Sequence, residues 1–159
     1  IEDIDKYKSF FSTVGEMLPC KYCRESFKIY YKYIPIDEFL DSRVGVTYWL
    51  YRIHQLVNEK VFKPNSTFEN VIRTYESFRA KCGKMSVNGE EDKKFKTCQG
   101  NKYAIDLDYL NDFIESSYKY KLIFDEKSND LYSSEENPNK DYLDYINKNI
   151  GKNKFKIEY

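Results

Sequence analysis

Three prolines, Pro19, Pro35 and Pro64, divide the first half of this 159-residue chain into segments of helical length. The residue directly before a proline avoids helical dihedral angles, so a helix usually ends there. Within residues 4–18 and 20–34, apolar side chains recur every three or four positions, which is the period of one face of an α-helix. The first half of the chain is therefore predicted to be a series of amphipathic helices.

The segment before the third proline contains the longest predicted helix. Ser42 is a suitable N-cap, and the helix is predicted to run to about residue 61. The positions predicted to face the core are Val46, Trp49, Leu50, Ile53, Val57 and Val61. After Pro64, Ser66 and Glu69 have the spacing of a capping box, which predicts a further helix over residues 67–82.

The chain changes character after Gly83. Residues 84–102 are rich in charge and contain glycine, which favours irregular structure. The remaining segments are predicted to be a helix over 105–118, a polar loop over 128–140 and a short helix over 141–150. We therefore predict an all-α fold in two parts, a helical bundle over 1–83 and a smaller, mainly helical or irregular domain over 84–159.

Charge and hydropathy exclude several classes of protein. The 26 basic and 26 acidic side chains cancel, so the chain has no basic field to attract nucleic acid or an acidic membrane. No apolar run reaches the roughly 20 residues that a membrane span needs. The first residues are acidic and polar, unlike a signal peptide. We expect neither nucleic acid nor a membrane span.

The four cysteines are more informative than the bulk composition. Cys20 and Cys23 stand at the start of a predicted helix, where free backbone N–H groups and the helix dipole stabilise a thiolate. A dithiol suited to exchange is one interpretation; a zinc site, which needs two further ligands, and a pair without redox function are the alternatives. Thioredoxin-like chemistry would require strands around the motif, and its flanks here are helical. Cys82 and Cys98 form either a structural bridge or a shuttle disulfide.

Two segments resemble the Erv/ALR family of FAD-dependent sulfhydryl oxidases. Residues 18–23 read Leu-Pro-Cys-Lys-Tyr-Cys, where the family shows Tyr-Pro-Cys-x-x-Cys. Residues 49–64 read Trp-Leu-Tyr-Arg-Ile-His-Gln-Leu-Val-Asn-Glu-Lys-Val-Phe-Lys-Pro, where the family shows Trp, His-Asn-x-Val-Asn and a turn ending in Lys-Pro. The resemblance covers about residues 4–82. Leu18 and Gln55 depart from the pattern, and the family's first helix has no counterpart here.

The resemblance implies a function for particular residues. Cys20 and Cys23 would form the active-site disulfide, with Cys23 against the flavin and Cys20 exchanging with the substrate. His54 and Asn58 would hold the adenine of FAD. Lys60 and Lys63 would lie along its phosphates and ribose. Tyr75 would pack its aromatic ring on the cofactor.

The resemblance also implies the reaction and its setting. A protein dithiol or thioredoxin-like substrate would be oxidised, with electrons passing through FAD to oxygen to give hydrogen peroxide. The chain is most similar to members from large DNA viruses, which implies a homodimer in the virion or infected host cytoplasm, or alternatively in the mitochondrial intermembrane space. No metal is expected. The competing hypothesis is an inactive Erv-like helical module that serves as a docking protein.

Overall fold

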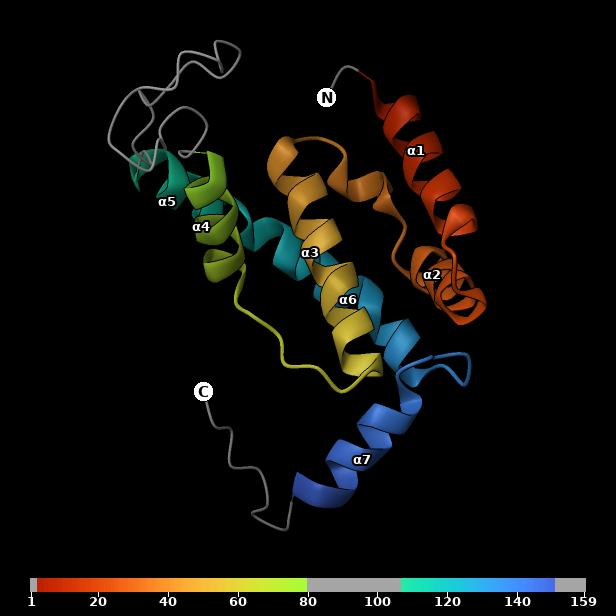
Figure 1. The fold of residues 1–159 in the computed structure, drawn as a ribbon. Coiled ribbons are helices and arrows are strands. Elements are labelled where there is room, and N and C mark those ends of the chain that lie inside the picture. The colour runs from red at the N-terminus through yellow and green to blue at the C-terminus, as the bar shows by residue number, and fades with distance from the viewer. Residues whose placement is uncertain (1–2, 80–106, 151–159) are drawn as a thin grey trace, which may run out of the picture. The chain divides into compact units, whose positions relative to one another are not determined.

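A computed structural model describes residues 3–79 and 107–150, which contain helices and no strand. The chain divides into two compact units, Ile1–Asn65 with Ser117–Tyr159 and, separately, Ser66–Ser116. The first unit contains α1 (Ile4–Met17), α2 (Lys21–Tyr33), the 3-10 helix η1 (Ile36–Phe39), α3 (Arg43–Lys60), α6 (Tyr118–Ser133) and α7 (Lys140–Ile150) (Figure 1). The second contains α4 (Phe68–Arg79) and α5 (Leu107–Ser116). The predicted all-α fold is confirmed.

Local capping explains where the helices begin. The Ser42 hydroxyl accepts a hydrogen bond from the Gly45 N–H at 3.0 Å, so the predicted N-cap of α3 is confirmed. At α4 the Thr67 hydroxyl accepts from the Asn70 N–H at 3.2 Å. The four predicted helices of the first half thus correspond to α1, α2, α3 and α4.

The core of the first unit is built around the only tryptophan of the chain. Trp49 is fully buried, and its indole N–H donates to the Ile34 carbonyl at 2.9 Å. Three rings pack against it edge-on, with centroids at 5.2 Å for Phe11, 6.4 Å for Phe27 and 6.0 Å for Tyr31. Edge-to-face packing is favourable for aromatic rings, so Trp49 joins α1, α2 and α3.

The buried face of α3 is rotated from the predicted one. Trp49 and Ile53 are buried as expected, but Leu50, Val57 and Val61 are exposed. The residues that α3 buries are Gly45, Tyr48, Trp49, Ile53 and Leu56. The rotation arises because α6 packs beside α3 and covers a side of it that was predicted to face solvent.

Helix α6 was not predicted, and the predicted loop over 128–140 is wrong for its first six residues, 128–133. The side chains that α6 buries are Tyr120, Phe124, Ser128 and Leu131, at spacings of four, four and three. Phe39 of η1 contacts the Tyr120 and Phe124 rings at centroid distances of 6.1 and 6.3 Å. Arg52 lies over the Phe124 ring at 4.3 Å and pairs with Asp125 at 3.1 Å. These contacts stabilise the helix through tertiary packing.

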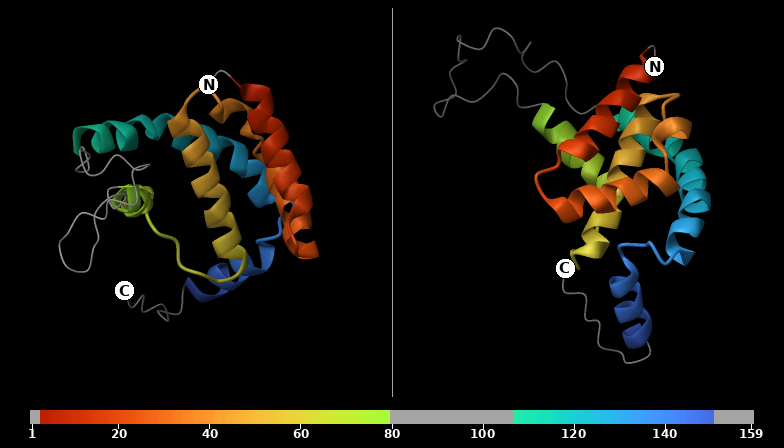
Figure 2. Two further views of the ribbon diagram at one scale, coloured as in Figure 1. Left: turned by 45° about the horizontal axis from the view of Figure 1, so that its top comes forward. Right: turned by 90° about the vertical axis from the view of Figure 1, so that its right-hand side faces the viewer.

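The compact units divide the chain at other points than residue 83. Both α6 and α7 pack in the first unit, where α6 lies along α3 and α7 lies at the C-terminal end of α3 (Figure 2). Asn139, just before α7, is fully buried and bonds to the Leu56 carbonyl at 2.8 Å and to the Tyr30 hydroxyl at 2.6 Å. Helix α6 and the turn that leads into α7 therefore complete the core of the first unit.

The end of α3 adopts a Schellman turn with an unusual residue. The Phe62 N–H donates to the Glu59 carbonyl at 3.1 Å, and the Lys63 N–H donates to the Asn58 carbonyl at 2.8 Å. Phe62 has φ 57°, a left-handed conformation that favours glycine. Its ring contacts the Tyr142 and Tyr145 rings of α7, with centroids 5.5 and 5.7 Å away. These contacts offset the backbone strain.

In the second unit, α4 packs on α5 through the Phe68 and Phe113 rings, stacked at 6.3 Å. The helix predicted over 105–118 is confirmed where it is described, as α5 over Leu107–Ser116, and the one predicted over 141–150 is confirmed as α7. The predicted charged segment 84–102 lies outside the described residues. Cys82 and Cys98 lie outside them as well, so both interpretations of that pair stay predictions.

Candidate active site: a dithiol at the start of α2

The dithiol is formed by the N-cap and the third residue of α2. Pro19 ends the approach from α1, and Cys20 follows with extended backbone angles, φ −88° and ψ 124°. The Cys20 Sγ accepts a hydrogen bond from the Cys23 N–H at 3.4 Å, which is the position of an N-cap oxygen in other helices. Both cysteines are free and exposed. Their thiols are therefore accessible to a substrate.

The same geometry makes the two thiols chemically unequal. Hydrogen bonds from Cys23, first from its thiol and then from its backbone N–H, lower the pKa of Cys20, and the Lys60 charge lowers it further. The pKa of Cys23 is raised, mainly because its thiol donates to Cys20, and also because of burial and the negative charge of Cys20. Cys20 is thus the thiol that carries negative charge more readily.

Two cationic side chains fix the backbone around the dithiol. The Arg24 guanidinium donates to the Leu18 carbonyl at 2.5 Å and so fixes the turn that enters α2. From α3, the Lys60 ammonium donates to the Ser26 hydroxyl at 2.5 Å and to the Tyr22 carbonyl at 3.3 Å. Arg24 and Ser26 were not among the predicted site residues. The available signal for Ser26 was its spacing, since a residue three positions after Cys23 lies on the same side of a helix.

The predicted cofactor residues of α3 do not all point the same way. His54 is exposed and shares one face of α3 with the exposed Leu50, Val57 and Val61, which stand at spacings of four, three and four. The imidazole of His54 makes no hydrogen bond to any of the described residues. This face is a mostly apolar surface with one imidazole.

The residues at the end of α3 have other partners. Asn58 donates from its side-chain amide to the Asn65 side chain at 3.1 Å, and Lys63 is exposed in the Schellman turn. Lys60 points to α2 and contacts the dithiol helix there. Tyr75 is 69% exposed on α4, in the second unit. The first unit thus brings Lys60 to Tyr22 and Ser26 of the dithiol helix and leaves His54 and Lys63 on its surface.

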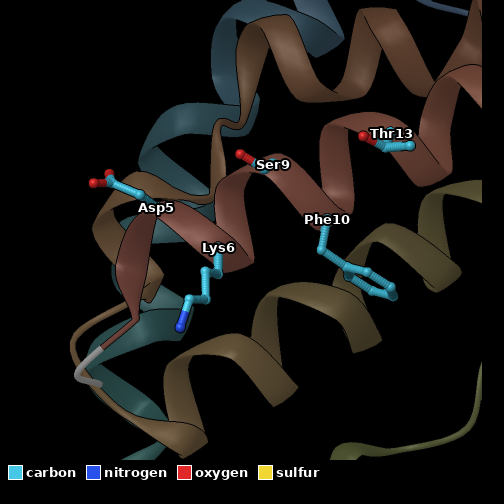
Figure 3. A pocket seen from close by; sticks show the side chains of 5 residues that line it. All are labelled: Asp5, Lys6, Ser9, Phe10 and Thr13. Carbon is cyan, nitrogen blue, oxygen red and sulfur yellow. The ribbon is translucent and has the colours of Figure 1, made fainter.

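Helix α1 also has an exposed apolar face. Its exposed apolar residues are Ile4, Tyr7, Phe10, Val14 and Met17. An open hollow on this helix is lined by Asp5, Lys6, Ser9, Phe10 and Thr13, and the Phe10 ring extends from α1 towards α3 (Figure 3). Phe10 is 59% exposed although its ring contacts Phe11 at 5.2 Å. The apolar face predicted for this helix is therefore mostly accessible.

In residues 3–79 and 107–150, no group of three or more His, Cys, Asp or Glu side chains is arranged to hold a metal ion. None of the helices in these ranges combines the length and apolar character needed to cross a membrane.

The sequence pattern of the Erv1 / Alr family matches residues 2–76, which include the dithiol and the whole of α3. This segment of the chain is similar to the Erv1 / Alr family. The Erv1 / Alr match ends within α4, so α5, α6 and α7 lie outside it.

A relative from Acanthamoeba polyphaga mimivirus, named as a probable FAD-linked sulfhydryl oxidase, is similar to the same part of the chain. The two are 32% identical over 88 residues, which is 55% of this chain and 62% of the relative. The chain thus spans less than two thirds of the length of that relative. No solved structure matches the chain.

Proposed function

We propose that the protein is a flavin-dependent thiol oxidase that introduces disulfides into protein substrates. The observation that carries the proposal is the exposed Cys20–Cys23 dithiol at the start of α2, with Cys20 as the N-cap. The match of residues 2–76 to the Erv1 / Alr family and the similarity to a viral protein named as a probable FAD-linked sulfhydryl oxidase support it. The Erv-like part of the chain, residues 1–83, would carry the chemistry.

The thiol chemistry consists of two exchange steps. In the oxidised protein, a substrate thiolate attacks the Cys20 sulfur, which forms a mixed disulfide and releases Cys23 as a thiolate. The second substrate thiolate then attacks the substrate sulfur of the mixed disulfide, which forms the substrate disulfide and releases Cys20. The dithiol has gained two electrons. A leaving thiol with a low pKa departs faster, so the lowered pKa of Cys20 favours the second step.

FAD fits the chemistry of the residues on the surface of the first unit. The exposed face of α3 presents Leu50, His54 and Val57, and such apolar and aromatic side chains suit a flat ring system. Lys63 is the exposed cation of the adjoining turn and suits a phosphate; Asn58 supplies an amide next to it. When bound, FAD accepts the two electrons of the dithiol and passes them to oxygen, which yields hydrogen peroxide.

The remaining assignments are proposals of the same kind. We place Cys23 as the thiol nearer the flavin and Tyr75 as an aromatic contact to it, and we expect a homodimer. The substrate is a protein dithiol or a thioredoxin-like protein. The viral relative supports a setting in the virion or the infected host cytoplasm.

The test is the Cys23→Ser variant of the full chain, purified beside the unchanged protein. We expect both proteins to carry flavin, seen as absorbance near that of free FAD, and only the unchanged protein to form hydrogen peroxide from dithiothreitol. Lys28→Ser is the matched control because it changes an exposed side chain of the same helix, and it should retain peroxide formation.

Two results would contradict the proposal. One is peroxide formation by Cys23→Ser at the rate of the unchanged protein, since the dithiol would then be dispensable. The other is an unchanged protein that is colourless and does not take up added FAD, which would favour an inactive docking module.

A further inference from the structure

Lys60 has a position that the FAD-binding expectation does not explain. It is the last residue of α3, yet its ammonium lies against the first turns of α2, on the Ser26 hydroxyl at 2.5 Å and the Tyr22 carbonyl at 3.3 Å. Ser26 is 5% exposed, and its own hydroxyl donates to the Tyr22 carbonyl at 2.8 Å. The ammonium is therefore held over the turn that contains both cysteines.

We propose that Lys60 is a positioning residue for the dithiol, which ties the first turn of α2 to the end of α3 and stabilises negative charge on the Cys20 sulfur. This inference rests on the proposed thiol oxidase function, because it names a residue that tunes the same dithiol. Lys60 acts through charge and through the backbone of Tyr22, and it does not contact the reacting atoms.

The charged groups around Cys20 support this assignment. From α2, Cys23 donates to Cys20, and Arg24 is a second cation, although its guanidinium is bonded to the Leu18 carbonyl. From α3, the Lys60 charge lowers the pKa of both cysteines. Lys21 pairs with Glu25 at 3.9 Å across an exposed face of α2, so these two charges largely cancel there.

A stabilised Cys20 thiolate has two consequences for exchange. The reduced dithiol becomes more stable relative to the disulfide, so the disulfide becomes a stronger oxidant of the substrate. Cys20 also becomes a better leaving group when the substrate disulfide forms. Loss of the Lys60 charge should weaken both effects while the thiols themselves remain.

The test measures the ionisation of Cys20 directly in the reduced full chain under anaerobic conditions. Initial rates of alkylation by iodoacetamide are followed across pH by mass spectrometry after trypsin digestion. Cleavage after Lys8, Lys21 and Arg24 places Cys20 in peptide 9–21 and Cys23 in peptide 22–24, so the two thiols are read separately. The readout needs neither flavin turnover nor oxygen.

Four variants separate charge from structure. Lys60→Met should raise the midpoint of Cys20 alkylation and slow the rate at pH 6 by about threefold. Lys60→Arg keeps the charge and should retain the midpoint. Ser26→Ala should shift the midpoint in the same direction as Lys60→Met, by less. Lys28→Met removes an equal positive charge from an exposed position of α2, four residues after Arg24. It should leave the midpoint of Cys20 alkylation unchanged.

Overlapping alkylation profiles for Lys60→Met and the unchanged protein would overturn the inference. So would an equal shift in Lys28→Met, because the effect would then come from net charge alone. A loss of FAD affinity in Lys60→Met with an unchanged Cys20 profile would also overturn it and return Lys60 to the cofactor. None of these results depends on peroxide formation, so the proposed function stands or falls separately.

Discussion

Replacing Asn139 with alanine tests how the C-terminal helices are joined to the core. The side chain of Asn139 is fully buried, and its oxygen accepts from the Tyr30 hydroxyl at 2.6 Å. Its amide donates to the Leu56 carbonyl at 2.8 Å and to the Glu59 carboxylate at 3.2 Å. Asn139→Ala removes all three bonds and leaves their partners in place.

The magnitude follows from what those partners can regain. A buried polar group left without a hydrogen bond costs roughly 1–3 kcal/mol. The Tyr30 hydroxyl can turn to the Leu56 carbonyl, which is 3.4 Å away, and Glu59 keeps its contact with the Tyr132 hydroxyl at 3.4 Å. The loss is therefore partly offset, and we expect the free energy of unfolding to fall by about 2–4 kcal/mol.

The assay is urea unfolding followed by tryptophan fluorescence. Trp49 is fully buried and is the only tryptophan, so the signal reports on the first unit. Asn147→Ala, at an exposed position of α7, is the matched control and should change the free energy by less than about 0.5 kcal/mol. An Asn139→Ala variant as stable as this control would refute the reasoning, since the buried bonds would then contribute nothing.

Two further predictions concern a backbone and a charge. Both Phe62→Gly and Phe62→Ala lose the ring contacts to Tyr142 and Tyr145. Because φ 57° suits glycine, the free energy of unfolding in urea should be about 1 kcal/mol higher for the glycine variant than for the alanine variant. Equal stability of the two variants would argue against backbone strain at this residue. Hydrogen bonds from Lys119 and then Tyr120 lower the pKa of Asp41, so its stabilisation is present above the unfolded pKa of about 3.9 and is lost on further acidification. Asp41→Asn should flatten the acid side of a thermal-melting pH profile; an unaltered profile would contradict this.

Local signals along the chain were sufficient for the helices of the first half. Proline positions, the Ser42 cap and apolar periodicity predicted α1, α2, α3 and α4 because those signals act on neighbouring residues. The dithiol was predictable for the same reason, since an N-cap and the residue three positions later interact within one helical turn. The choice of Cys20 as the thiolate needed the structure.

The missed features all depend on packing between distant segments. Nothing within residues 128–133 distinguishes a polar loop from a helix, and α6 forms because Phe124 and Leu131 are buried in the first unit. Leu50 and Val57 were predicted to be core because they are apolar, but which face of α3 is covered depends on where η1 and α6 lie. Periodicity alone does not distinguish a core face from an exposed apolar face.

Sequence by itself determined the all-α class, the order of the first four helices, the Erv-like resemblance and the place of Cys20 and Cys23 at the start of a helix. Tertiary structure alone decided that Lys60 bonds to Tyr22 and Ser26 of the dithiol helix and that Asn139 binds the core from the C-terminal part of the chain. Both contacts join residues more than 30 positions apart, at a separation of 34 for Ser26 and Lys60 and 83 for Leu56 and Asn139. Such pairs are set by how the helices pack, and no local pattern in the chain encodes which pairs will meet.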